Sequence, residues 1–394
     1  MTSFPLQNRV MRLLVLLLTA VGLLGWLGAR PAAPARLLDQ LAAISCTNVV
    51  SAAPETLVPV GNILSPSEWP RPQQRFTPDP LPTPAPFSLA WRMGVSVPDG
   101  NPFFFDWKAP RPGWYLNWST NDYAQEDSLA DLGMEFTPMV RLRAEGLHPD
   151  VYTIYRLAQE KPGRTWLIGN EPDVRWQGDA PPDEYACLYH QAYQTIKLAD
   201  PSAQVANGGI SQITPLRLRY LDAVWASYRA QFGTQMPVDI WNMHLFILRE
   251  EEGNWGVGVP PGFDGATDGV PWDVEDHDKL ALVEEQVRRM RGWMAAHGQR
   301  DKMLYITEYG ILIPAEFGFT PSRVVQFMVG SFDLLTELRD PETGYPADDN
   351  RLAQRWVWFS TRDRLYPVGD LFAADGTPLP PMRAMTGYIR AHSD

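Results

Sequence analysis

The feature that most constrains the fold is an alternation of short apolar runs with longer amphipathic segments, which begins near Phe87 and continues toward the C-terminus. Each short run has the length of a β-strand, whereas the longer segments carry apolar residues at helical spacing. The predicted strands are Leu89–Val95, Trp114–Trp118, Glu135–Val140, Thr165–Ile168, Gln204–Ala206, Val238–Leu245, Met303–Thr307 and Arg355–Phe359. Eight strands that alternate with helices predict a (β/α)8 TIM barrel, which forms one large domain.

The helical segments between these strands have recognisable starts. They are Asp183–Leu198, Pro215–Phe232, Asp278–Ala296 and Pro321–Leu338. In Asp278–Ala296, for example, Leu280, Val283, Val287 and Met294 fall near one face and charged residues lie opposite. A doubly wound open sheet is the alternative α/β fold, but no glycine-rich phosphate-binding loop follows a predicted strand to support it.

The N-terminus has the pattern of an export signal. Arg9 and Arg12 precede an apolar run from Leu13 to Ala29. The run is long for a cleaved signal and lies at the lower limit for a membrane span, so it is either a signal peptide or an uncleaved anchor. Because the positive charges precede it, we expect the rest of the chain to lie outside the cytoplasm. The protein is then extracellular, either secreted or tethered to the outer face of the membrane, and contacts the membrane only through this segment.

The chain is accordingly predicted to have three parts. Residues 1–30 are the signal peptide or membrane anchor, an apolar helix, and residues 31–86 are a proline-rich linker in which residues 37–45 have a helical pattern. Residues 87–394 are the TIM-barrel domain, which the residues at its strand ends identify below as the catalytic domain. Within it, the connection Arg249–Asp278 has no regular pattern, and it is either a wall over the substrate cleft or a surface insertion.

Composition excludes several classes of partner. The formal net charge is −12 and no basic stripe is present, so the chain is not expected to bind nucleic acid. The two cysteines, Cys46 and Cys187, are too few for a disulfide framework, and we expect two unpaired thiols. No motif for a metal or a cofactor is present, and none is expected. We expect a monomer.

Two glutamates carry the predicted chemistry. Barrel enzymes hold their catalytic groups at the C-terminal ends of the strands, where Glu171 and Glu308 follow the fourth and seventh predicted strands. Glycoside hydrolysis needs two carboxyl groups of this kind, one that protonates the leaving oxygen and one that attacks or activates water. Other candidates at the strand ends are Asn117, Trp118, Arg141, Arg143, Asn170, Asn207, His244 and Trp358, and the pattern does not decide between Arg141 and Arg143.

An ordered set of motifs carries a family resemblance. The motifs are Trp114–Ser119, Glu135–Met139, Leu167–Asp173, Val238–His244 and Leu304–Gly310. Together they look like clan A of the glycoside hydrolases. Within that clan the chain most resembles the alkali-sensitive-linkage-protein type of catalytic core, glycoside hydrolase family 128, a group that includes β-1,3-glucanases.

The resemblance implies a role for each matching residue. Glu171 is expected to be the acid/base and Glu308 the nucleophile. Asn170 is expected to bind the sugar 2-hydroxyl, His244 to orient the site, and Trp358 to form a platform beneath the reactive sugar. Further substrate contacts are expected from Trp118, Asn117 and Arg141.

The function implied is that of a retaining β-glycosidase. It would hydrolyse O-glycosidic bonds of a polysaccharide or oligosaccharide substrate, a β-1,3-glucan by resemblance, through a double displacement at two glutamates. The alternative is a catalytically inactive carbohydrate-binding or cell-wall scaffold protein on a hydrolase-like barrel, which the anchor-like N-terminus and the long spacer favour.

Overall fold

The computed structural model describes residues 33–46, 76, 81–122 and 132–392. The chain divides into two compact units, residues 1–44 and 45–394. The described part of the first unit contains one helix, α2 (Ala33–Ala42), which begins before the helical pattern predicted for residues 37–45. The predicted apolar helix of residues 1–30 and most of the proline-rich spacer lie outside the described residues. Where the chain is described, no helix is long and apolar enough to span a membrane.

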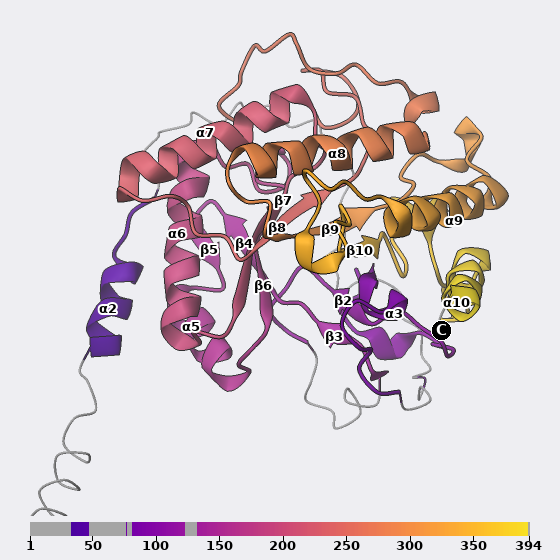
Figure 1. The fold of residues 1–394 in the computed structure, drawn as a ribbon, viewed down its shortest axis with the longest axis horizontal. Coiled ribbons are helices and arrows are strands. Elements are labelled where there is room, and N and C mark those ends of the chain that lie inside the picture. Colours follow the sequence, from indigo (N-terminus) through magenta and orange to yellow (C-terminus); the bar gives the residue numbers. More distant parts are fainter. Residues whose placement is uncertain (1–32, 47–75, 77–80, 123–131, 393–394) are drawn as a thin grey trace, which may run out of the picture. The chain divides into compact units, whose positions relative to one another are not determined.

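The second unit has a mixed α/β fold built on one curled sheet (Figure 1). Its strands are β1 (Met93–Ser96), β2 (Trp114–Leu116), β3 (Glu135–Phe136), β4 (Met139–Arg143), β5 (Gly146–His148), β6 (Thr165–Asn170), β7 (Gln204–Gly209), β8 (Ile240–His244), β9 (Met303–Tyr309) and β10 (Arg355–Trp358). They are hydrogen-bonded in the order β3-β2-β1-β10-β9-β8-β7-β6-β4-β5, and only β4 and β5 pair antiparallel.

The sheet curls back on itself at residues 137–138, which are all that separates β3 from β4. On one side of this gap, Met139 N donates to Ser119 O at 2.9 Å. On the other side, Leu167 N donates to Pro138 O at 2.9 Å. In the strand order, β3 and β5 are the two ends of the sheet. The two hydrogen bonds join the start of β4 to the segment after β2 and β6 to the residue before β4, so backbone hydrogen bonding continues past the end of β3.

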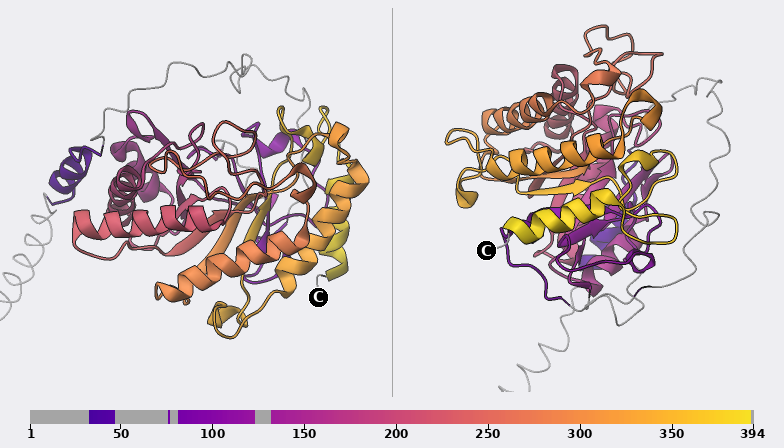
Figure 2. Two further views of the ribbon diagram at one scale, coloured as in Figure 1. Left: turned by 90° about the horizontal axis from the view of Figure 1, so that it is seen from above. Right: turned by 90° about the vertical axis from the view of Figure 1, so that its right-hand side faces the viewer.

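In Figure 1 the long helices lie to the left of, above and to the right of the strands, and Figure 2 shows the helices from two further sides. They are α3 (Leu89–Arg92), α5 (Val151–Glu160), α6 (Pro182–Ala199), α7 (Pro215–Phe232), α8 (Leu280–Ala296), α9 (Pro321–Glu337) and α10 (Pro380–His392), and short 3-10 turns are η2 (Pro102–Phe104), η3 (Val274–Asp276), η4 (Ala315–Phe317), η5 (Pro346–Asp348) and η6 (Pro367–Gly369). Local sequence explains their starts. Thr214 and Thr320 cap α7 and α9 through their side chains, and each is followed by a proline at the first helical position.

The core has an inner and an outer layer. Inside the curled sheet lie Trp114, Leu116, Met139, Leu167, Ala206, Ile240, Tyr305 and Val357. The intervening strand residues, such as Tyr115, Ile168 and Trp241, pack outward in the larger cluster with the helices. Because successive strand residues point to opposite faces, this division tells which side chain at each strand end faces the interior.

The predicted helices α6 to α9 are confirmed, and so are the predicted strands except at two places. The predicted strand Glu135–Val140 is interrupted at residues 137–138 and forms β3 and the start of β4, and one N-terminal segment is not a strand. Leu89–Arg92, predicted as the start of a strand, is the helical turn α3. The side chain of Ser88 accepts a hydrogen bond from Trp91 N at 3.4 Å and so caps that turn, and the strand begins only at Met93. The helices α5 and α10 were not among the predicted elements.

The expectation of two unpaired thiols is wrong. Cys46 and Cys187 form a disulfide with a Cα–Cα distance of 5.5 Å. Both residues belong to the second unit, where Cys187 lies on α6. Because they are 141 residues apart, only the folded chain brings them together.

Candidate active site

Strand alternation directs Trp118 and His244 into the mouth of the sheet. Trp118 continues the inward row of Trp114 and Leu116 beyond β2, and the indole packs against that inner cluster. His244 ends β8, whose inward row starts at Ile240. The same rule places Arg141 in the inward row of Met139 on β4.

Glu308 reaches the mouth because β9 contains an irregularity. Leu304 and Ile306 face outward, so strict alternation would turn Glu308 outward as well. The pairing with β8 shifts between Met243 and His244, such that Ile306 pairs with Met243 but Glu308 pairs with His244. One extra residue in a strand re-aims the side chains that follow it, and here it turns Glu308 inward.

One imidazole lies between the two predicted catalytic carboxylates. His244 Nδ1 is 3.0 Å from Glu171 Oε1, and His244 Nε2 is 3.4 Å from Glu308 Oε1. The same Glu308 oxygen accepts a hydrogen bond of 2.6 Å from Trp118 Nε1. Glu171, His244 and Glu308 are all buried. The ends of β2, β6, β8 and β9 therefore meet in one polar cluster.

Two members of this cluster have unusual backbone conformations. Glu171 has φ of 42° and Trp118 has φ of 53°, both in the left-handed region that non-glycine residues rarely adopt. Such conformations cost on the order of 1–3 kcal/mol and persist only where the surroundings enforce them. Hydrogen bonds enforce the one at Glu171, since its N–H donates to Gly209 O and its carbonyl accepts from Val174 N and Gly178 N.

Burial and neighbouring charges set the protonation of the cluster. The pKa of Glu308 is raised to about 7: burial and the charge of Glu171 raise it, and together they outweigh His244, Trp118 and Arg141, which act to lower it. Burial lowers the pKa of His244, but the charges of Glu308 and Glu171 outweigh burial and leave that pKa above its ordinary value. The two carboxylates therefore favour the cationic form of the histidine.

Two further predicted residues lie in the mouth. Burial lowers the pKa of Arg141, while the charges of Glu308 and Glu171 act in the opposite direction, so the guanidinium lies close enough to interact with both carboxylates. Arg143, the alternative, is exposed. Asn170 is buried beside Glu171, and its Oδ1 has no hydrogen-bond partner among the described residues.

Three predicted residues serve the fold instead. Asn117 closes a local turn, since its amide donates to Gly100 O and Asn121 O. Trp358 is fully buried, packs on Tyr309, and donates from Nε1 to Gly369 O at 2.8 Å. It cannot underlie a sugar there, because it faces outward with Trp356. Asn207 is fully buried and bonds to Asn242 on β8.

Sequence reasoning missed two residues of the mouth. Phe359, one position after Trp358, contacts the ring of Trp118 with 5.9 Å between centroids. Alternation from the inward Val357 turns Phe359 inward, but only the structure shows that Val357 faces inward. Gly209 was also missed, although a Cβ there would come within 2.2 Å of His244 Cδ2. Only a glycine lets the imidazole lie against β7.

A buried guanidinium organises the loops beside Glu171. Arg217 on α7 donates from Nε to Asp173 Oδ2 at 2.7 Å and pairs through Nη1 with Glu250. It also donates to the carbonyls of Val257 and Gly258 at 3.3 Å. All three charged side chains are buried, so the contacts compensate for their lost hydration. These contacts fix Glu250, Val257 and Gly258, in the first part of the connection Arg249–Asp278, beside the turn that follows Glu171.

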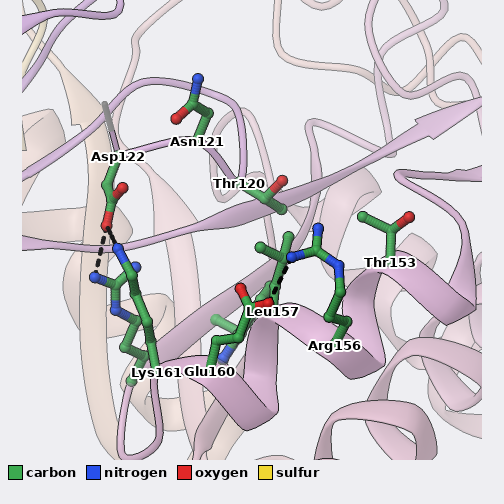
Figure 3. A pocket seen from close by; sticks show the side chains of 10 residues that line it. Thr120, Asn121, Asp122, Thr153, Arg156, Leu157, Glu160 and Lys161 are labelled. Atoms are coloured by element: carbon green, nitrogen blue, oxygen red, sulfur yellow. Dashed lines mark hydrogen bonds and ion pairs between the residues drawn. The ribbon is translucent and has the colours of Figure 1, made fainter. Parts of the chain in front are cut away.

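A polar pocket beside α5 holds none of the predicted catalytic residues. Figure 3 shows this pocket, in which Asp122 binds Lys161 at 2.6 Å and Arg164 at 2.7 Å. Its wall is the face of α5, where Arg156 pairs with Glu160. Within the described ranges, no group of three or more histidine, cysteine, aspartate or glutamate side chains is arranged to hold a metal ion.

No family model matches the chain, and no curated protein matches it in sequence. Solved structures do match its fold. A GH128 subgroup II endo-β-1,3-glucanase from Pseudomonas viridiflava is 16% identical over 75% of this chain and 96% of its own, with a TM-score of 0.50. The subgroup II enzyme from Sorangium cellulosum is 18% identical over 75% and 97%, with a TM-score of 0.49. The second unit therefore has the fold of a GH128-like glycoside hydrolase.

Proposed function

We propose that this chain is a retaining β-glycosidase that hydrolyses a β-1,3-glucan through a double displacement at Glu171 and Glu308. The observation that carries the proposal is the pair of buried carboxylates at two strand ends, with His244 between them. The sequence motifs and the fold shared with the Pseudomonas viridiflava endo-β-1,3-glucanase support the choice of substrate class.

We also infer that the curled sheet is a (β/α)8 barrel in which β3 and β4 are two parts of one strand. The hydrogen bonds across residues 137–138 support this inference. In such a barrel the active site lies at the C-terminal ends of the strands, where Glu171, His244 and Glu308 are found.

In the first step, Glu171 donates its proton to the glycosidic oxygen while a carboxylate oxygen of Glu308 attacks the anomeric carbon. The bond to the leaving sugar breaks and a glycosyl ester on Glu308 forms. In the second step, Glu171 takes a proton from water, which attacks the same carbon and releases Glu308. Trp118 and His244 hold Glu308 in position and favour its ionised form. Asn170 Oδ1, which has no hydrogen-bond partner among the described residues, would accept a hydrogen bond from the sugar 2-hydroxyl.

Export from the cytoplasm is part of the proposal. The Cys46–Cys187 disulfide supports it, because disulfides persist mainly in oxidising compartments. We propose that residues 1–30 direct this export and are either cleaved or retained as an anchor. Mass measurement of the exported protein distinguishes the two, since retention leaves the full chain intact.

The test is hydrolysis of laminarin, with cellulose, xylan and mannan in parallel, followed by proton NMR of the first product. Retention releases the β-anomer before mutarotation. Glu308→Gln should lower kcat at least about a thousandfold while laminari-oligosaccharides still bind. Binding of glycans without hydrolysis of any of the four would favour the scaffold alternative, and release of the α-anomer would exclude double displacement.

A further inference from the structure

We propose that Trp176 forms a sugar-binding subsite on the leaving-group side of the cleavage point. This inference rests on the proposed function and extends it to the part of the substrate that departs. Trp176 is 58% exposed, more than any other large hydrophobic side chain in the described part of the chain. It has neither a ring contact nor a hydrogen bond there, so its indole is available to a ligand.

The turn that carries Trp176 is closed onto the proposed proton donor. Gly178 N donates to Glu171 O at 3.1 Å, and Val174 N donates to the same oxygen at 3.0 Å. In addition, Asn170 Nδ2 lies 3.4 Å from Gln177 Oε1. Trp176 therefore lies in a tight loop, residues 171–178, whose two ends are joined by the hydrogen bond from Gly178 N to Glu171 O.

The indole contacts the β8–α8 connection (Arg249–Asp278) through the edge of its six-membered ring. A Cβ on Gly258 would lie 3.7 Å from Trp176 Cη2 and 3.8 Å from Cζ3, which puts the six-membered ring against the Gly258 backbone. The carbonyl of Gly258 accepts hydrogen bonds from Arg217 at 3.3 Å. Arg217 also holds Asp173, so one buried guanidinium fixes both the ring support and the turn after Glu171.

A second contact joins the same two loops. Arg175, the neighbour of Trp176, pairs with Asp264 in the β8–α8 connection. A platform that is already fixed loses little conformational freedom when a ligand binds, which favours affinity. More than half of the indole stays open to solvent although its loop is held at two places.

The chemistry identifies the ligand as a pyranose ring of the leaving chain. A flat aromatic face packs against the apolar C–H face of a β-linked glucose, and indole Nε1 can donate to a hydroxyl. Because Glu171 protonates the oxygen of the leaving sugar, residues on its own turn lie on the side of that sugar. Trp176 would thus favour substrates that extend beyond the cleaved bond.

The experiment compares two substrates with the full-length protein. Laminarihexaose places sugars on both sides of the cleaved bond, whereas a β-laminaribiosyl fluoride has no leaving sugar. Trp176→Ala should lower the ratio of kcat/KM for the hexaose to kcat/KM for the fluoride by about tenfold, and Trp176→Phe should recover most of the loss. The matched control is Phe87→Ala, which removes an exposed aromatic ring that precedes β1, at the other end of the strands.

An unchanged ratio in Trp176→Ala would overturn the subsite, whether kcat/KM stays the same on both substrates or falls equally on both. If the wild-type protein cleaves neither substrate, the proposed function fails instead. The subsite is then tested by calorimetry of laminarihexaose binding, with and without Trp176→Ala. In that case equal affinities would overturn the subsite, and about tenfold weaker binding would support it.

Discussion

Trp118 Nε1 lies 2.6 Å from Glu308 Oε1, and the two residues come from the ends of β2 and β9. The indole N–H can only donate, so this hydrogen bond is strongest when the carboxylate is ionised. Glu308 is otherwise buried, and burial favours its protonated form. Trp118 thus counteracts part of the cost of ionising Glu308.

The pH dependence of kcat/KM should distinguish the roles of the two glutamates. With the pKa of Glu308 near 7, kcat/KM should be low in acid and rise as pH increases through about 7, because only the ionised carboxylate attacks. A pH profile of initial rates on laminarin checks this. If activity instead falls as pH rises through 7, Glu308 is the proton donor and the two roles are reversed.

Trp118→Phe should shift the rise of kcat/KM to a higher pH. The variant keeps an aromatic ring beside Phe359 but removes the donor to Glu308, so the pKa of the carboxyl rises. Loss of a hydrogen bond to a charged group corresponds to a shift of about one pH unit or more. If kcat/KM instead falls by the same factor at every pH and its rise stays at the same pH, Trp118 contributes only by packing.

Gly209→Ala should disable the site without a backbone penalty at Gly209 itself. The added Cβ would lie 2.2 Å from Cδ2 and 2.3 Å from Nε2 of His244, so the imidazole must move. A displacement of this size in a catalytic cluster can cost about a hundredfold in kcat/KM. Gly292→Ala on α8 is the control, since a Cβ there meets nothing within 4 Å. Equal activity of both variants would contradict the tight packing of His244 on β7.

Glu308→Gln should be more stable than the wild-type protein in mildly alkaline solution. The folded pKa of about 7 exceeds the ordinary value of 4.5, so between these values the folded state binds more protons than the unfolded state. Stability of the wild-type protein therefore falls as pH rises through this window. The variant avoids this loss, worth up to about 3 kcal/mol at pH 8 and near zero at pH 4. Thermal melts at both pH values test it, and a destabilised variant at pH 8 would refute it.

Reduction of the Cys46–Cys187 disulfide should lower stability but leave activity intact. The bond closes a loop across a separation of 141 residues, which corresponds to up to about 5 kcal/mol when chain entropy dominates. Thermal melts with and without reductant measure the effect, and Cys187→Ser should not respond to reductant. If the melting temperature of the wild-type protein is the same with and without reductant, the disulfide does not stabilise the fold.

The arrangement of elements was predictable because local periodicity carries it. The helices α6 to α9 follow from amphipathic spacing and from capping residues such as Thr214 and Thr320. The meeting of Glu171, His244 and Glu308 was predictable as well, because parallel strands bring their C-terminal ends to one edge. The catalytic roles of the two glutamates stay predictions.

Three features could not be predicted from local pattern. Trp358 and Phe359 are adjacent aromatics, and which of them faces the mouth depends on the register of β10 against its neighbours. The irregularity that turns Glu308 inward is likewise a property of strand pairing. Arg217 looks like any helical arginine in sequence, yet it is fully buried between two carboxylates.

By itself, then, the sequence of this protein determined the order of strands and helices and the residues at the strand ends, because both depend on neighbours a few positions apart. Only the tertiary structure decided the Cys46–Cys187 bond, the Arg217 network, the inward turn of Glu308 and the outward burial of Trp358. These depend on contacts between residues far apart in the chain, whose geometry is set when the sheet curls and its register is established.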